Sequence, residues 1–406
     1  MKNLFLTISI VSSFLFASCS SDDDQPIVQN TVEAPATYKF MRGTESTVSF
    51  DGQTTRILMA GETANAFMDF DNATETSLLA MFNHQAGDTD FSDADLNDSD
   101  KNLRSKTAAS YDYFFTNTSE SAAIRATFED YISSQINEVF PNIMVVAAPG
   151  TPGQIADGSR TRYVNAKGLE YNQAFAKSLL GAVMTDQILN NYLSTAVLDE
   201  GNNRENNDND VTEENKAYTT MEHKWDEAYG YLYGTSANPE NPNLTIGEDD
   251  KFLNEYVGRV NDDPDFSTIA AEIFDAFKMG RAAIVAKNYE VRDEQIAIIR
   301  EKISEVIAVR GIYYLQAGKN KIVDGDRQGA FHSLSEAYGF VYSLRFTRKS
   351  DTNIPLFSRI EVDTLLNMLI NSSDNGFWDI TPETLDAVSE AMAAKFDFTV
   401  AQAGSL

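Results

Sequence analysis

Apolar residues recur every three to four positions over most of the chain, which is the spacing of an amphipathic α-helix. The pattern is strongest in two long segments, residues 165–198 and residues 291–317. Further helices are predicted over residues 75–84, 119–140, 265–287, 361–370 and 382–396. Thr381 followed by Pro382 is typical of a helix start, because threonine caps the first turn and proline needs no hydrogen-bond acceptor there. The sequence therefore predicts a mostly α-helical fold.

Three segments interrupt the helical pattern. Residues 47–50 and 54–58 favour strands and flank Asp51-Gly52, which predicts a small N-terminal β-hairpin. Residues 146–160 are rich in proline and glycine, so we expect a loop and a boundary between parts of the fold. Residues 201–210 are almost entirely polar and predict a solvated loop, after which Asp210 and Glu213 would form a capping box that restarts the helix.

One phrase occurs twice, and it contains two of the three histidines of the 406-residue chain. The first copy is His-Lys-Trp-Asp-Glu-Ala-Tyr-Gly-Tyr-Leu-Tyr from His223, and the second is His-Ser-Leu-Ser-Glu-Ala-Tyr-Gly-Phe-Val-Tyr from His332. The copies start 332 − 223 = 109 positions apart, and His, Glu, Ala, Tyr, Gly and the last Tyr coincide. Each copy follows one of the long helical segments. We therefore predict an internally duplicated helical bundle built from two helical hairpins.

The repeated phrase carries chemistry as well as packing residues. On a helix, side chains four positions apart share a face with Cβ atoms about 5–6 Å apart, so His223 pairs with Glu227 and His332 with Glu336. A buried imidazole and carboxylate need partners. Either each pair fastens neighbouring helices through hydrogen bonds, or each pair contributes to a metal site of the kind that suits Zn or Fe. If the two copies face each other, all four side chains would converge on one site.

The aromatic residues of the phrase leave two alternatives open. Tyr229 and Tyr338 lie on the apolar stripe of their helices, and Tyr231 continues the stripe of His223 and Glu227. They are either part of the core or the lining of a groove for a glycan or peptide. No nucleophile motif, phosphate-binding loop or zinc-protease motif accompanies them, so we expect a protein without enzymatic activity.

The first residues have the features of a targeting segment. Lys2 precedes an apolar run over residues 4–16 that is too short to span a bilayer, and Phe16-Ala17-Ser18-Cys19 resembles a bacterial lipoprotein cleavage box. We expect a signal peptide over residues 1–18, a lipidated Cys19 and a flexible tether over residues 19–36. Cys19 is the only cysteine, so no disulfide is available to the fold. The interpretation places the protein at the outer membrane, facing either the cell surface or the periplasm.

The net charge of the chain limits the classes of molecule that it can bind. The formal net charge is −29 with a sequence pI near 4.4, which repels phosphate backbones and excludes nucleic acid as a partner. An acidic field attracts cations and basic ligands, although solubility alone also explains it.

Three stretches resemble an uncharacterised family of bacterial lipoproteins: residues 36–40, residues 96–106 and the two repeated phrases. Members of that family are associated with imelysin-like proteins, which are helical and linked to iron uptake. Imelysin-like proteins carry Gly-x-His-x-x-Glu on a helix, and the residues around His223 are similar, with Met221 in place of Gly and Asp226 in place of Glu. The resemblance implies a metal role for His223 with Asp226 or Glu227, and more remotely for His332 and Glu336.

The sequence thus predicts a hairpin with helices over residues 37–160, a first helical repeat over 161–290 and a second over 291–406. The leading functional hypothesis is a non-enzymatic envelope lipoprotein that helps to capture iron, another metal or a metal-bearing ligand, with an outer-membrane transporter or an imelysin-like protein as partner. The alternative is a substrate-capture or interaction lipoprotein that serves such a transporter, in which the His-Glu pairs are purely structural.

Overall fold

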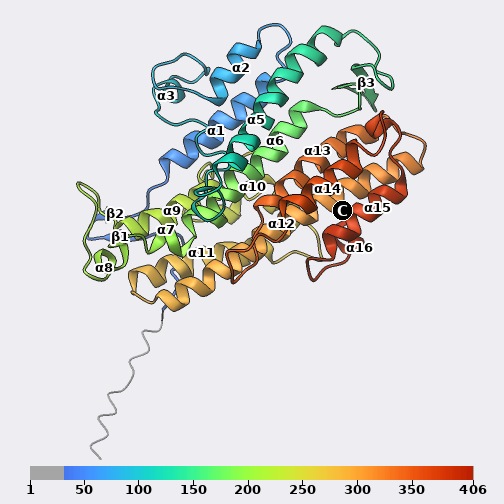
Figure 1. Cartoon of the computed structure of the whole chain (residues 1–406). Coiled ribbons are helices and arrows are strands. Elements are labelled where there is room, and N and C mark those ends of the chain that lie inside the picture. The colour runs from blue at the N-terminus through green and yellow to red at the C-terminus, as the bar shows by residue number, and fades with distance from the viewer. Residues whose placement is uncertain (1–31, 406) are drawn as a thin grey trace, which may run out of the picture. The chain divides into compact units, whose positions relative to one another are not determined.

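A computed structural model describes residues 32–405, and most of these residues are helical, as the sequence predicts (Figure 1). The expected signal peptide, the lipidated Cys19 and most of the expected tether lie outside the described residues. Contacts along the chain group residues from Val32 onward into one compact unit. Among residues 32–405, none of the helices combines the length and hydropathy that a membrane span requires.

The N-terminal third contains two long helices and three shorter ones. Its helices are α1 (Asp51–Ala66), α2 (Glu75–Phe82), α3 (Ala94–Asn97), α4 (Tyr111–Phe114) and α5 (Thr118–Ser134). Helix α5 continues through a π-helical turn, Gln135–Val139, and stops at Pro141, which confirms the helix predicted over 119–140.

The middle of the chain contains the first of the two long helical segments predicted from the sequence, followed by the first copy of the repeated phrase. Helix α6 (Tyr171–Leu179) runs on through the π-helical segments Leu180–Thr185 and Ile188–Tyr192, within the range predicted from apolar spacing. After it come α7 (Thr195–Leu198), α8 (Asn203–Asp208), α9 (Thr220–Tyr233), α10 (Leu253–Asn261) and α11 (Ile269–Val285).

The loop predicted at 201–210 is wrong in its main part, because residues 203–208 form α8, but most of the segment is exposed, as predicted. Asn207 is buried there, and its amide donates to the Ile284 carbonyl at 2.9 Å and accepts from the Thr219 hydroxyl at 2.8 Å. The predicted capping box at Asp210 is also wrong, since Asp210 has a positive φ of 53°. The box forms at Thr219 and Glu222 instead and starts α9.

The C-terminal part is a set of longer helices that match the predicted periodicity. They are α12 (Tyr289–Val323), α13 (Ala330–Ser343), α14 (Arg359–Ile370), α15 (Pro382–Ala393) and α16 (Val400–Ala403). Thr381 accepts a hydrogen bond from the Thr384 N–H and Pro382 occupies the first turn of α15, as predicted. Helix α12 packs against α11, α13 and α15 (Figure 1).

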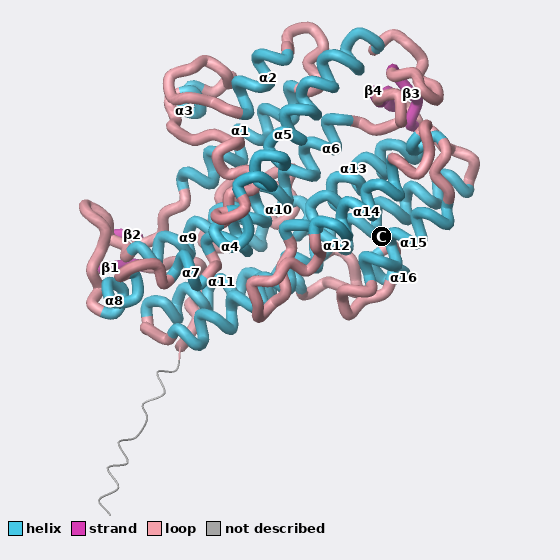
Figure 2. The backbone as a smooth tube through the Cα atoms, in the orientation of Figure 1, coloured by secondary structure: helices cyan, strands magenta, loops and turns pink. Residues whose placement is uncertain are grey.

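Strands occupy two small patches in the described part of the chain, shown in magenta in Figure 2. β1 (Met41–Arg42) pairs with β2 (Glu45–Ser46), and β3 (Gly153–Asp157) pairs antiparallel with β4 (Arg160–Val164). The predicted N-terminal hairpin is therefore present, but over residues 41–46. The β3–β4 hairpin was not predicted, because its glycines and prolines suggested a loop.

The segment expected to form the N-terminal strands is instead helix α1. Gln53, Arg56, Ile57 and Ala60 are buried with helical spacing, so residues of the expected turn and second strand share one packed helix face. The close contact of this face with α9 outweighs the β-propensity of the two threonines in the segment.

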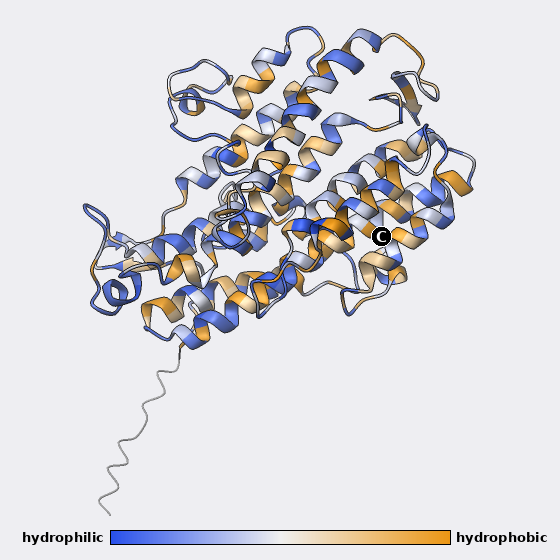
Figure 3. Cartoon of the chain, in the orientation of Figure 1, coloured by the Kyte–Doolittle hydropathy of each residue, from blue (hydrophilic) through white to orange (hydrophobic). Residues whose placement is uncertain are grey.

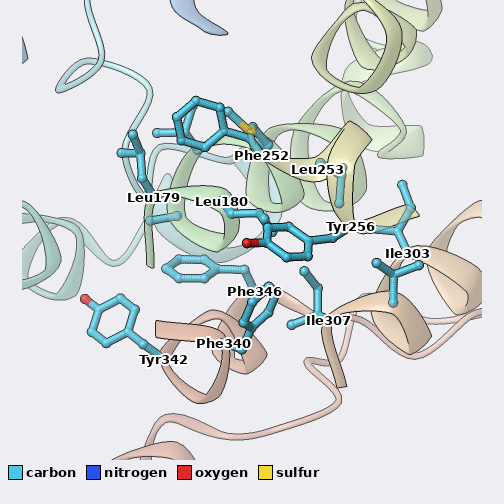
Figure 4. Packing of buried hydrophobic residues seen from close by; sticks show 14 of the residues in the cluster. Leu179, Leu180, Phe252, Leu253, Tyr256, Ile303, Ile307, Phe340, Tyr342 and Phe346 are labelled. Carbon is cyan, nitrogen blue, oxygen red and sulfur yellow. The ribbon is translucent and has the colours of Figure 1, made fainter. Parts of the chain in front are cut away.

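The core is continuous between the helices rather than divided between the two copies of the phrase. Apolar positions, orange in Figure 3, recur along helices that also carry polar positions. Figure 4 shows Tyr256 of α10 among Ile307 of α12 and Phe340 of α13, and all three are at most 1% exposed. Tyr256 and Phe340 meet edge to face with ring centroids 4.7 Å apart.

Close helix approach at Gly280 gives a prediction with an internal control. A Cβ atom at Gly280 of α11 would lie 2.2 Å from the Trp225 ring of α9, whereas a Cβ at Gly61 of α1 would meet no atom within 4 Å. We expect Gly280→Ala to lower the free energy of unfolding by about 1–3 kcal/mol through overpacking. Gly61→Ala should raise it by about 0.5–1 kcal/mol through helix propensity. Urea unfolding of both variants tests this, and equal shifts in the two variants would contradict the close approach.

Candidate functional site

The two copies of the repeated phrase, residues 223–233 and 332–342, make up most of α9 and α13, and the two helices pack in equivalent ways. Gly230 of α9 lies against Phe50 and Gln53 at the start of α1, and Gly339 of α13 lies against Lys177 of α6. The residue two positions after each histidine packs on a glycine of another helix: Trp225 contacts Gly280 of α11, and Leu334 contacts Gly318 of α12. Each copy of the phrase therefore forms a helix against which two other segments pack closely, one on each side.

In the first copy, His223 and Glu227 have separate partners. The Nδ1 of His223 lies 3.1 Å from the Ser49 carbonyl oxygen, which can only accept, so Nδ1 carries the proton and Nε2 is left for another partner. The imidazole stacks on the Tyr218 ring at 4.5 Å. Glu227 accepts from Gln53 Nε2 at 3.0 Å and from Lys224 Nζ at 2.8 Å. Burial alone would raise the pKa of Glu227, but Lys224 and His223 hold it below its ordinary value.

Asp226 belongs to a buried ionic network and does not line the space beside His223. Its Oδ1 accepts from the Tyr38 hydroxyl at 2.6 Å and from Arg281 Nε at 3.0 Å. Arg281 also donates to Glu222 at 3.0 Å and to the Thr47 hydroxyl at 2.9 Å. Burial raises the pKa of Asp226 to about 6, against the lowering effect of Arg281 and the Tyr38 hydrogen bond. This network joins the N-terminal hairpin region to α9 and α11.

In the second copy, the histidine bridges two carboxylates. His332 Nδ1 lies 3.1 Å from Glu170 Oε1, and Nε2 lies 3.7 Å from Glu336 Oε2. Lys177 Nζ lies 3.6 Å from the other oxygen of Glu336. Because Nδ1 and Nε2 lie on opposite edges of the ring, the two carboxylates cannot chelate one ion together with one ring nitrogen.

The structure therefore places the two His-Glu pairs in two separate polar clusters rather than in one converged site. Within residues 32–405, no set of three or more His, Cys, Asp or Glu side chains is arranged to hold a metal ion. The four-ligand site that would follow from facing copies does not form. The physical reason is that each pair is satisfied by residues of a different helix, α1 for the first copy and the start of α6 for the second.

The tyrosines of the phrase divide between core and surface. Tyr229 and Tyr231 are fully buried, and Tyr229 stacks on Tyr38 with ring centroids 3.6 Å apart. These two residues therefore belong to the core. Tyr338 is partly exposed and lines a surface pocket of about 340 Å³ together with Tyr342 and Arg345.

A pocket of about 400 Å³ lies beside His223 and Glu227, and its other walls come from residues far away in the sequence. Arg56 of α1 is 7% exposed and donates to the Asn102 and Gly52 carbonyls, both at 3.1 Å. Lys106 donates to the Tyr192 hydroxyl at 3.1 Å and lies over the Tyr192 ring. In the described part of the chain, neither Arg56 nor Lys106 forms an ion pair with a carboxylate.

These cations place positive charge in the pocket, whereas the net charge of the whole chain is negative. Burial lowers the pKa of Lys106 to about 8, and the nearby Arg56 adds to the lowering. Lys101, which is paired with Asp100, lines the pocket as a third cation. Asp51 and Glu227 are its two carboxylates, and Glu227 is paired with Lys224. The arrangement can hold an anionic group between Arg56 and Lys106, with His223 Nε2 as a further polar contact.

Sequence reasoning found His223 and Glu227 but missed Arg56, Lys106 and Tyr192. Their positions follow no local pattern, since three segments must fold together before they meet. One signal was present: residues 96–106, one of the stretches that carry the family resemblance, contain both Lys101 and Lys106.

Comparison with known proteins identifies a family but no characterised relative. No curated protein and no solved structure shows significant similarity to the chain. The model of the family described as Domain of unknown function (DUF4856) matches residues 35–399, which include both copies of the phrase and every residue of the pocket. The chain therefore belongs to the DUF4856 family.

Proposed function

We propose that the protein is a non-enzymatic binding protein that holds a small anionic ligand in the pocket beside His223. The observation that supports this proposal is that two largely buried cations, Arg56 and Lys106, form no direct ion pair with a carboxylate among the described residues, although the charge of Glu227 acts on Lys106. A buried charge without a counter-ion is costly, and a carboxylate or phosphate bound between the two side chains would offset that cost. Charge-assisted hydrogen bonds to such a group are also the strongest that side chains make.

A metal-bearing anion is a second candidate, favoured by the geometry of His223. Its Nδ1 donates to a backbone carbonyl, an arrangement that commonly orients a metal-ligating histidine with Nε2 free. A bare cation fits poorly, because both oxygens of Glu227 are engaged and Arg56 and Lys106 would repel it. A chelate with carboxylates on its surface would use the cations and the imidazole together. Iron and zinc are among the metals that suit imidazole.

We further propose that this binding takes place at the cell envelope. The support is the sequence of residues 1–19, with its short apolar run and Cys19, together with the resemblance to lipoproteins associated with imelysin-like proteins. A lipid anchor would place the domain beside an outer-membrane transporter, which could receive the captured ligand. Recovery of the full-length chain in the outer-membrane fraction, lost in Cys19→Ala, tests the anchor.

Lys106 gives the direct test of anion binding. We expect the full-length chain to bind citrate in calorimetric titrations, and Lys106→Met to weaken binding at least tenfold because one of the two unpaired cations is lost. The folded pKa of Lys106 is about 8, so its charge is present below that pH and lost above it. Affinity should therefore fall as the pH rises from 7 to 9, and Lys106→Met should remove most of that fall.

Lys395→Met is the matched control, because Lys395 is more exposed and pairs with Glu361 on the surface. It should bind as the parent does. Equal citrate affinity in Lys106→Met and in the parent would refute the anion site. For the metal-bearing alternative, iron retained after loading with ferric citrate should be lost in His223→Ala and kept in His332→Ala, since His332 is held between two carboxylates. Loss in both variants or in neither would contradict a role for the first copy.

A further inference from the structure

A large hollow lies away from His223 and is not part of the proposed anion site. It measures about 1110 Å³ and is lined by the first half of α12, by residues 194–196 at the start of α7 and by residues 350–354. Its volume exceeds what a single amino acid or a simple anion fills and suits a ligand of several residues.

The buried wall of this hollow carries an arginine, Arg300, that forms no ion pair with a carboxylate of the described residues. Arg300 is 6% exposed, and one of its terminal nitrogens donates to the Leu193 carbonyl at 2.8 Å. Its Nε is buried and has no partner among the described residues. The neighbouring Arg348 is paired with Asp112, and Arg300 itself forms no ion pair with a carboxylate of the described residues, although the charge of Asp112 acts on it from nearby. Burial, together with Arg348, lowers the pKa of Arg300 to about 10.

The exposed part of the same hollow is mainly acidic. Arg204 also lines it, but lies over the Tyr289 ring and 3.9 Å from Asp199. Glu290, Glu294 and Asp351 are exposed, line the hollow and form no ion pair with any described residue. Asp293 lies on the same helix and is paired with Arg292. The hollow thus has a buried positive group and an exposed negative rim. A plain dianion or monoanion would be repelled at the entrance, and a plain cation would meet Arg300 inside.

We infer that this hollow is a second binding site, which takes a short peptide with its C-terminal carboxylate on Arg300 and its positive groups toward Glu290, Glu294 and Asp351. A peptide fits the charge pattern because it carries both signs at opposite ends. It also fits the walls, since Ala196, Ile296, Ala297 and Ile354 offer apolar surface to side chains, while residues 350–353 offer hydroxyl and amide groups. The inference stands independently of the anion site at His223.

The test compares trialanine, its C-terminal amide, its N-acetyl derivative and alanine in calorimetric titrations with the full-length chain. We expect trialanine to bind, the amide to bind at least tenfold more weakly, and the acetylated peptide to bind a few-fold more weakly. Alanine should bind much more weakly than trialanine because it cannot reach the rim and the arginine together. Equal binding of the amide would overturn the assignment of the carboxylate to Arg300, and equal binding of alanine would overturn the assignment to peptides.

Two variants locate the site. Arg300→Met should abolish trialanine binding, and its fold should survive because an unpaired buried charge is replaced by an apolar side chain of similar length. Glu294→Gln, on the exposed rim, should weaken trialanine binding a few-fold without changing the binding of the acetylated peptide. Lys106→Met should bind trialanine as the parent does. Unchanged binding in Arg300→Met, with an unchanged melting temperature, would refute the proposal, as would the absence of saturable trialanine binding to the parent.

Discussion

Replacing Arg281 by methionine should lower the free energy of unfolding by about 3–5 kcal/mol, which is the cost of leaving a buried charge without its partner. Arg281 is fully buried and donates to Asp226 and Glu222, both of which are also buried. Methionine fills a similar volume but donates nothing, so the carboxylate of Asp226 would keep only the Tyr38 hydroxyl. The shift in the midpoint of urea unfolding at constant slope measures the effect.

A surface ion pair provides the matched control for this substitution. Arg359 is 58% exposed at its side chain and lies 3.4 Å from Asp363 four residues later on α14. Arg359→Met should change the free energy of unfolding by less than about 1 kcal/mol. In the double variant Arg281→Met, Asp226→Asn, part of the loss should be recovered, since no ionised carboxylate then remains unpaired at position 226. If Arg281→Met lowered the free energy of unfolding no more than Arg359→Met does, the network would not hold the N-terminal segment.

The same network positions the candidate site. Arg281 donates to the Thr47 side chain, and two residues later the Ser49 carbonyl accepts from His223 Nδ1. The segment that leads into α1 is thus fixed at one point by the buried arginine and at the next by the histidine. Loosening it would displace Gln53 and Arg56, which lie on the first turns of α1 and line the pocket. We therefore expect Arg281→Met to weaken citrate binding, although Arg281 is not part of the pocket.

The sequence predicts best those helices in which the apolar residues, three and four positions apart, are the ones that become buried. Helices α11, α12, α14 and α15 bury residues three and four positions apart, and their predicted bounds differ from the observed ones by a few residues. Asp51-Gly52 misled the prediction because the two residues are typical of a hairpin turn. They begin α1, where contact with Gly230 of α9 decides the conformation, and no local signal reveals that contact.

The candidate site was predictable only in its repeated part. The duplication identified His223 and Glu227, and helical geometry placed them on one face. The duplication could not show whether the two His-Glu pairs meet at one site, because the helix that packs against each copy is determined by the whole fold. Arg56 and Lys106 reach the pocket from segments about 50 residues apart in the sequence. Their lack of carboxylate partners, which makes the pocket a candidate site, is visible only in three dimensions.

Replacing Asp186 by asparagine should make the stability of the protein much less dependent on pH. It is fully buried in the continuation of α6, where its carboxylate accepts the backbone N–H groups of Ala109 and Ser110 at 3.1 and 3.0 Å. Burial raises its pKa to about 7, although hydrogen bonds from Ser110 and Asn190 act in the opposite direction. The folded pKa therefore lies above that of the unfolded chain, near 3.9.

The sign of the effect follows from this difference. A carboxyl group with a raised folded pKa contributes stability that is fully present below the unfolded pKa, near pH 4, and lost as the pH rises to about 7. Asp186→Asn cannot ionise, so it should not lose stability for this reason. The free energy of unfolding of the variant relative to the parent should therefore rise by about 3–5 kcal/mol between pH 4 and pH 8.

The measurement is a pair of urea unfolding series at pH 4, 5, 6, 7 and 8. The amide places an NH2 group where the parent has Oδ1, facing the side chain of Asn190, and this adds an offset that does not depend on pH. Only the slope of the difference therefore reports the ionisation of Asp186. Asp88→Asn, at an exposed position, should follow the parent at every pH. Parallel curves for Asp186→Asn and the parent would mean that Asp186 ionises in the folded protein as readily as in the unfolded one. The two N–H donors of Ala109 and Ser110 would then outweigh its burial.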